Sequence, residues 1–156
     1  MNLTVGDKAP SFALYASDKS EVKLSNYQGR NVVILFFPLA FTSVCTKELC
    51  MTRDDIGIYG ELDTDVVAIS VDTVATLNKF KSENEFNFTL LSDFNKEVAR
   101  AYGCLYERFS LGMKGVAKRA SFVIDRSGTI QYAEVLDNPG ELPNFTKIKE
   151  TLHSLP

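Results

Sequence analysis

Histidine and cysteine, the usual ligands of a structural zinc ion, are scarce in this sequence of 156 residues. It has one histidine, His153, and three cysteines, at positions 45, 50 and 104. A structural zinc site normally needs four ligands with recognisable spacing, which these residues do not provide. A chain of this length buries enough apolar surface to fold without disulfides. We therefore expect no metal and no bound cofactor, and the three thiols are left as core residues or reactive groups.

The sequence also has no excess of positive charge and no long apolar run. Lysine and arginine number 17 against 20 aspartates and glutamates, a net charge of −3, which argues against a nucleic-acid-binding protein. The longest apolar run, at 32–37, is far shorter than the ~20 residues that span a bilayer. The first residues lack the features of a secretory signal. We expect a cytoplasmic protein that binds neither nucleic acid nor membrane.

Strand and helix patterns alternate along the chain and predict one α/β domain over residues 1–156. The order suits a thioredoxin-like fold, with a mixed central β-sheet flanked by helices, whose last two strands form a hairpin through a turn at 125–128. Strands are predicted at 11–16, 31–37, 65–71, 88–91, 120–124 and 129–136. Helices are predicted at 44–62, 73–84, 95–102 and 142–155, and a turn at 23–29.

The segment that carries chemistry is the junction after the strand at 31–37. This strand stops at Pro38, a short loop follows, and a helix begins with Cys45 in its first turn. The N-terminus of a helix carries unpaired N–H groups and positive charge, which favour a thiolate. Glu48 has the wrong sign for this effect unless a cation offsets it. Pro38 ends the strand without an unpaired N–H and can shield Cys45 from water.

Two further side chains have both a functional and a structural interpretation. The Thr42 hydroxyl can accept from a thiol and donate to a ligand oxygen, as a bound peroxide requires, or it can simply cap the helix. Arg119 can be a fixed cation beside the thiolate or a solvated charge at the end of a strand, next to Lys118. Cys45 itself can be a small core residue.

Cys50 lies five residues after Cys45. On an intact helix this spacing means ~7.5 Å of rise and ~140° of rotation. Disulfides rarely join Cα atoms more than about 7 Å apart, so a bond between the two requires local unwinding. The spacing also differs from the Cys-x-x-Cys of thiol–disulfide oxidoreductases. On spacing alone, Cys50 is equally well a core residue on one helix face.

The sequence resembles the peroxiredoxins over residues 3–153. The stretch PLAFTSVC, at 38–45, fits their P-x-x-x-T/S-x-x-C signature, and KRASFVID, at 118–125, is similar to the segment with their active-site arginine. VGDKAPSF, at 5–12, resembles their usual opening. CTKELC, at 45–50, is similar to the C-T-x-E-x-C of the bacterioferritin-comigratory or peroxiredoxin Q branch, which is related to alkyl hydroperoxide reductases.

This resemblance implies a thiol peroxidase for hydrogen peroxide and organic hydroperoxides. Cys45 is then the peroxidatic thiolate that becomes a sulfenic acid. Thr42 and Arg119 hold and polarise the peroxide, Pro38 limits access of solvent, and Glu48 orients Arg119 through an ion pair.

The resemblance further implies that Cys50 is the resolving thiol, giving a Cys45–Cys50 disulfide that thioredoxin or a glutaredoxin-type protein reduces. Cys104 is then a buried spectator or a second resolving partner. Two alternatives stay open: a one-cysteine peroxidase resolved by an external thiol, and a redox-sensing thioredoxin-like interaction module. The resemblance is compatible with a monomer or a homodimer.

Overall fold

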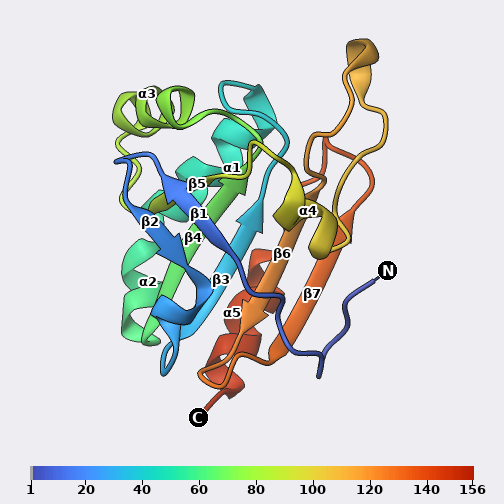
Figure 1. Ribbon diagram of the computed structural model, residues 1–156. Coiled ribbons are helices and arrows are strands. Elements are labelled where there is room, and N and C mark those ends of the chain that lie inside the picture. Colours follow the sequence, from blue (N-terminus) through green and yellow to red (C-terminus); the bar gives the residue numbers. More distant parts are fainter. Residues whose placement is uncertain (1) are drawn as a thin grey trace.

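A mixed β-sheet forms the centre of the computed structural model, which describes residues 2–156 (Figure 1). The strands are β1 (Ala13–Ala16), β2 (Glu21–Lys23), β3 (Asn31–Phe36), β4 (Thr64–Ser70), β5 (Thr89–Ser92), β6 (Arg119–Ile124) and β7 (Ile130–Leu136). Their order across the sheet is β2-β1-β5-β4-β3-β6-β7. The helices are α1 (Ser43–Asp54), α2 (Ile56–Glu61), α3 (Val74–Asn84), α4 (Glu97–Ala101) and α5 (Phe145–Ser154).

The centre of the sheet is parallel and its flanks are antiparallel. β3, β4 and β5 run parallel to one another, while β6 pairs antiparallel with β3. Every residue of β3 is buried, as expected for a strand covered on both faces. The predicted hairpin of β6 and β7 is confirmed, and the Asp125 carboxylate accepts from the amides of Ser127 (2.9 Å) and Thr129 (3.0 Å) in its turn.

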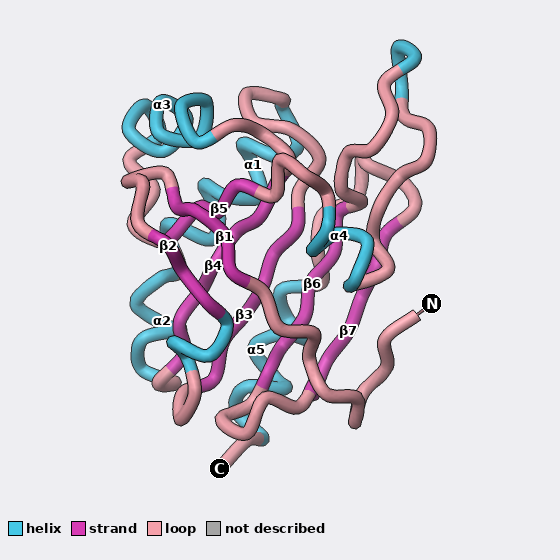
Figure 2. The backbone as a smooth tube through the Cα atoms, viewed as in Figure 1, coloured by secondary structure: helices cyan, strands magenta, loops and turns pink. Residues whose placement is uncertain are grey.

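Two apolar clusters lie on opposite faces of the sheet, because successive strand residues point to opposite sides. One cluster contains Val33 and Leu35 of β3 and is covered by residues of α1, α2, α3 and α5. The other contains Ile34 and Phe36 and is covered by α4 and the N-terminal segment, which cross the near face in Figure 1. The tube in Figure 2 shows the segment between α4 and β6 projecting beyond the strand ends.

The prediction of a single helix over 44–62 is wrong. The structure has two helices there, α1 and α2, which are separated at Asp55. The backbone of Asp55 leaves helical geometry, with ψ of 6°, and its carboxylate accepts from Lys149 Nζ of α5 at 2.6 Å. Gly57 and Gly60 also make α2 a weak helix.

Several other helices and strands begin or end at residues that differ from the prediction. The region predicted as a turn at 23–29 contains the last residue of β2 and a 3₁₀ helix at Leu24–Tyr27. β1 begins two residues later than predicted. α5 begins at Phe145, because Asn144 caps it by accepting from the Lys147 amide. α4 is shorter than the predicted 95–102, and α3 begins after the capping residue Thr73. Within residues 2–156, no helix is long and apolar enough to cross a membrane.

Candidate active site

Cys45 is placed by the junction between β3 and α1. The Phe37 amide donates to the carbonyl of Ile69 at 3.0 Å, so the pairing of β3 with β4 extends to the residue before Pro38. Pro38 is buried, and α1 begins at Ser43 after a four-residue loop. Cys45 is the third residue of α1 and only 1% exposed. The prediction that Cys45 lies in the first helical turn is confirmed, and this turn is at the positive end of the dipole of α1.

Arg119 reaches the same point from the neighbouring strand. It is the first residue of β6, beside the end of β3, where Phe36 pairs with Ala120. Its Nη2 lies 3.4 Å from Cys45 Sγ, and its Nη1 donates to Glu48 Oε1 at 2.6 Å. Arg119 is 1% exposed and Glu48 is 0% exposed. The interpretation of Arg119 as a solvated strand-end charge is therefore wrong.

The buried pair sets the charge around the thiol. Burial raises the pKa of Glu48 to about 7, although the Arg119 guanidinium opposes this shift. Burial acts to lower the pKa of Arg119, but Glu48 and Cys45 outweigh it and the net direction is upward. Arg119 thus remains a cation and offsets the charge of Glu48 near the Cys45 sulfur.

A backbone carbonyl that the sequence analysis missed also fixes Arg119. Nη2 donates to the carbonyl of Pro139 at 2.9 Å, in the loop after β7. This loop is tightened by Asn138, whose Oδ1 accepts from the Gly140 amide at 2.8 Å. The guanidinium is thus anchored from both α1 and this loop. A carbonyl contact of this kind leaves no signal in side-chain patterns.

Thr42 occupies the residue before α1, but its side chain does not act as the predicted cap. Its hydroxyl donates to the carbonyl of Leu39 at 2.7 Å. Since the single hydroxyl proton is committed there, the oxygen is left to accept a hydrogen bond. Thr42 is exposed, so an incoming molecule can reach this oxygen.

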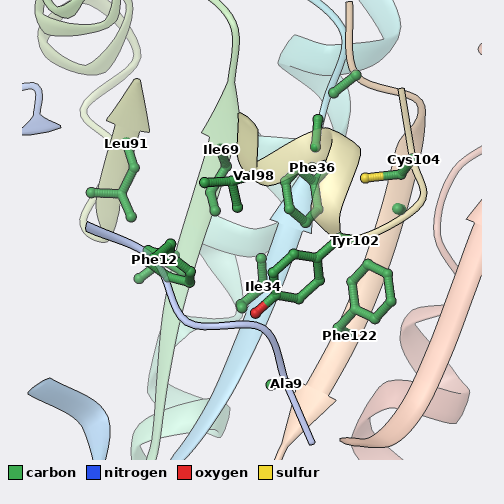
Figure 3. Close-up of a cluster of buried hydrophobic side chains, with 14 of the residues drawn as sticks. Ala9, Phe12, Ile34, Phe36, Ile69, Leu91, Val98, Tyr102, Cys104 and Phe122 are labelled. Atoms are coloured by element: carbon green, nitrogen blue, oxygen red, sulfur yellow. The ribbon is translucent and has the colours of Figure 1, made fainter. Parts of the chain in front are cut away.

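The structure separates the remaining cysteines from Cys45 in two different ways. Cys50 lies on the same unbroken helix α1 and packs half-buried against the cluster on the Cys45 side of the sheet. Cys104 lies on the other face, in the cluster with Phe36 and Tyr102 (Figure 3). All three cysteines carry free thiols. Burial, with a smaller contribution from a nearby carboxylate, raises the pKa of Cys104 well above its usual range.

A histidine base and a metal ion are two other groups that could take part in chemistry at such a site. His153 lies in the last turn of α5 and is exposed. Among the described residues 2–156, no cluster of three or more His, Cys, Asp or Glu side chains could hold a metal ion.

Comparison with known proteins assigns this chain to a family. The AhpC/TSA family matches residues 5–133. The chain belongs to the AhpC/TSA family. It is 41% identical over 143 residues to alkyl hydroperoxide reductase E of Mycobacterium tuberculosis, covering 90% of each chain. It is 36% identical over 132 residues to peroxiredoxin Bcp of Escherichia coli K12, covering 83% of this chain and 84% of that one.

Solved structures of this family share the fold. Peroxidoxin BcpB from Mycobacterium tuberculosis superposes with a TM-score of 0.88 at 30% identity and covers 99% of both chains. The predicted thioredoxin-like fold and the resemblance to the peroxiredoxins are therefore confirmed. The family and its peroxiredoxin members establish this AhpC/TSA protein as a thiol peroxidase, an oxidoreductase.

Proposed function

We propose that this peroxidase reduces hydrogen peroxide and organic hydroperoxides through the thiolate of Cys45. The observation that supports it is the 3.4 Å contact between Arg119 Nη2 and Cys45 Sγ, two side chains that are each 1% exposed. The sulfur attacks the terminal oxygen of the hydroperoxide and forms an S–O bond while the O–O bond breaks. The departing hydroxide or alkoxide takes a proton from solvent and leaves as water or alcohol. Cys45 is oxidised to a sulfenic acid.

Charge moves from sulfur to the departing oxygen during this step, and fixed dipoles stabilise the change. Arg119 contacts the sulfur and offers N–H donors to the peroxide, while the Thr42 oxygen accepts from its O–H. Glu48 orients Arg119 through their 2.6 Å ion pair. Pro38, which is buried beside the loop, limits solvent access to the sulfenic acid. No histidine base is assigned in this step, and the positive charge beside the Cys45 sulfur comes from Arg119.

Cys50 is proposed to resolve the sulfenic acid. Its thiol attacks the sulfur of Cys45, a disulfide forms and water leaves. Because both residues lie on α1, the first turns must unwind for the sulfurs to meet. The Thr42 hydroxyl is turned to Leu39, so this helix end lacks the ~1 kcal/mol that a side-chain cap supplies, which favours unwinding. A thioredoxin or glutaredoxin-type protein then reduces the disulfide.

Turnover with thioredoxin, thioredoxin reductase and NADPH tests this cycle. The wild type is expected to oxidise NADPH continuously when hydrogen peroxide is added, Cys45→Ser to show no reaction, and Cys50→Ser to consume one equivalent of peroxide and then stop. Wild-type activity in Cys50→Ser would contradict its resolving role and favour an external thiol. One oxidation of Cys45 without recycling by thioredoxin, glutaredoxin or a small thiol would instead favour the redox-sensing module.

A further inference from the structure

One peptide group in the loop before Cys45 is held from both sides. The carbonyl of Leu39 accepts from the Thr42 hydroxyl at 2.7 Å, and the amide of Ala40 donates to Asp72 Oδ2 at 2.8 Å. This carbonyl and this amide belong to the same peptide, which is planar and turns as one unit. The contact at Asp72 therefore determines the direction in which the carbonyl faces Thr42.

Asp72 is itself anchored to the parallel strands. It follows the C-terminal end of β4, and Ser70, the last residue of that strand, donates its hydroxyl to Asp72 Oδ2 at 2.7 Å. Ser92, the last residue of β5, donates its hydroxyl to the carbonyl of Asp72 at 2.5 Å. Both serines are buried. The carboxylate is thus a rigid part of the sheet edge that faces the loop.

The loop needs such an anchor because part of it is strained. Phe41 has a φ of 65°, in the left-handed region that a bulky side chain rarely adopts. Its ring centroid lies 5.0 Å from that of Phe80 on α3, so packing holds one side of this residue. A strained backbone persists only where its surroundings over-determine it. The hydrogen bond from Ala40 to Asp72 supplies the constraint next to Phe41 in the sequence.

We propose that Asp72 is a positioning residue for peroxide reduction that acts through the Leu39–Ala40 peptide on Thr42. This proposal rests on the function proposed for Cys45 and Thr42. While Asp72 holds the Ala40 amide, the Leu39 carbonyl takes the Thr42 proton, and the lone pairs of the threonine oxygen stay available for the O–H of the hydroperoxide. Without this carboxylate the peptide can turn over. Its N–H then donates to the threonine oxygen and competes with the peroxide.

Two rates separate this role from general damage to the site. The rate of Cys45 oxidation by hydrogen peroxide depends on the thiolate and on Thr42, whereas alkylation by iodoacetamide depends on the thiolate alone. Asp72→Ala is expected to slow peroxide oxidation roughly tenfold or more, because misplaced positioning groups have effects of this size. Alkylation is expected to stay within about twofold of the wild type, since no thiolate contact is removed.

The conservative variants and a matched control sharpen the test. Asp72→Asn keeps an acceptor for the Ala40 amide and is expected to retain most of the peroxide rate. Ser70→Ala removes one hydrogen bond to Asp72 and is expected to have a smaller effect than Asp72→Ala. The control is Asp65→Asn, near the other end of β4, whose carboxylate is paired with Arg30. Its peroxide rate is expected to equal that of the wild type.

A double-mutant comparison tests the route through Thr42. In a Thr42→Val background, Asp72→Ala is expected to cause no further loss of peroxide rate, because both variants remove the same interaction. A wild-type peroxide rate in Asp72→Ala would overturn the proposal, as would an equal fall in peroxide and alkylation rates or full additivity with Thr42→Val. If Asp72→Ala fails to fold, the same comparison is made with Ser70→Ala, where an unchanged ratio of the two rates would overturn the proposal.

Failure of the underlying function has a different signature. If Thr42→Val alone leaves the peroxide rate unchanged, the role proposed for Thr42 fails. If Cys45→Ser still reacts with peroxide at the wild-type rate, the role proposed for Cys45 fails. The proposal for Asp72 alone fails in a different way: Thr42→Val and Cys45→Ser are both slow with peroxide, while Asp72→Ala keeps the wild-type peroxide rate.

Discussion

Two thiols of this protein are equally hidden from solvent and differ in almost everything else. Cys45 is 1% exposed and Cys104 is 0% exposed, and they lie in the clusters on opposite faces of the sheet. Cys45 has a cationic nitrogen of Arg119 at 3.4 Å and the start of α1 around it. Cys104 lies among apolar side chains, where burial raises its pKa (Figure 3). Because the two thiols are equally buried, exposure cannot distinguish them, and we expect the neighbouring cation to make Cys45 the reactive one.

Keeping a cation in one face of the core requires compensation. A buried charge is costly unless it is paired and hydrogen-bonded. Arg119 obtains both from Glu48 on α1 and from the Pro139 carbonyl after β7. The face around Cys104 carries no such arrangement in the described residues that form its cluster. The two faces therefore differ in that only the Cys45 side contacts this compensated buried cation, whereas the residues of the Cys104 cluster are held by apolar packing.

Exchanging the Cys45 thiol for a hydroxyl has the largest expected effect on activity, and the same exchange at Cys104 is its control. Cys45→Ser is expected to lower the rate of peroxide consumption on the order of 10⁴-fold or more, because the nucleophile is lost. Cys104→Ser is expected to keep the wild-type rate. Stopped-flow measurement of peroxide consumption checks both, and a slow Cys104→Ser protein with native structure would contradict the view that Cys104 takes no part in the reaction.

Removing the cation beside Cys45 has the next largest expected effect. Arg119→Met is expected to slow the reaction with hydrogen peroxide by about 10²- to 10³-fold, as for loss of one preorganised donor in a transition state. The matched control is Lys118→Met, which removes an adjacent cation paired with Asp137 at the surface. Its rate is expected to stay within about twofold of the wild type. Equal rates for the two variants would contradict the role of Arg119.

Glu48 gives the Cys45 face a pH dependence. Its folded pKa of about 7 lies above the ordinary value of 4.5, so the folded state holds a proton that the unfolded state releases between these values. The contribution of Glu48 to stability is fully present below pH 4.5 and is lost as pH rises through about 7. Relative to Glu48→Gln, the wild type should lose roughly 3 kcal/mol over this window.

Urea unfolding at pH 5, 6, 7 and 8 checks this expectation. The difference in unfolding free energy between Glu48→Gln and the wild type should grow up to about pH 7 and then level off. Glu150→Gln, at an exposed position of α5, serves as the control and should follow the wild type. A difference that stays constant with pH would contradict a raised pKa for Glu48.

The smallest expected effect is on stability at the other face. Cys104→Ser places a hydroxyl in an apolar cluster and is expected to lower the unfolding free energy by about 1–3 kcal/mol. Cys45→Ser is expected to lower it less, because the guanidinium of Arg119 can donate to the new hydroxyl. Urea unfolding of both variants at pH 7 measures this difference, and the reverse order would contradict it.

The sequence predicted the parts of the site that depend on local order along the chain. The strand, Pro38, the loop and the helix start at Cys45 follow from adjacent residues. The contact of Arg119 with Glu48 joins residues 71 positions apart and came only from the family resemblance. The face on which Cys104 lies depends on the path after α4, which periodicity does not encode.

Features that depend on backbone geometry were not predicted. The Pro139 carbonyl has no side-chain signature, and the break at Asp55 depends on a contact with α5. Asp72 had a signal that was not used. It lies two residues after the end of a buried parallel strand, and polar residues there gather at the carboxyl end of the sheet, where sites form.

Mapping the thiols after a single oxidation shows which of the three cysteines reacts with peroxide. The reduced protein is treated with one equivalent of hydrogen peroxide, free thiols are blocked, and the digested peptides are identified by mass. We predict oxidation of Cys45, as a sulfenic acid or a disulfide with Cys50, while Cys104 remains a free thiol. Oxidation of Cys104 to the same extent as Cys45, or an unmodified Cys45, would contradict the claim that neighbouring charge selects the reactive thiol.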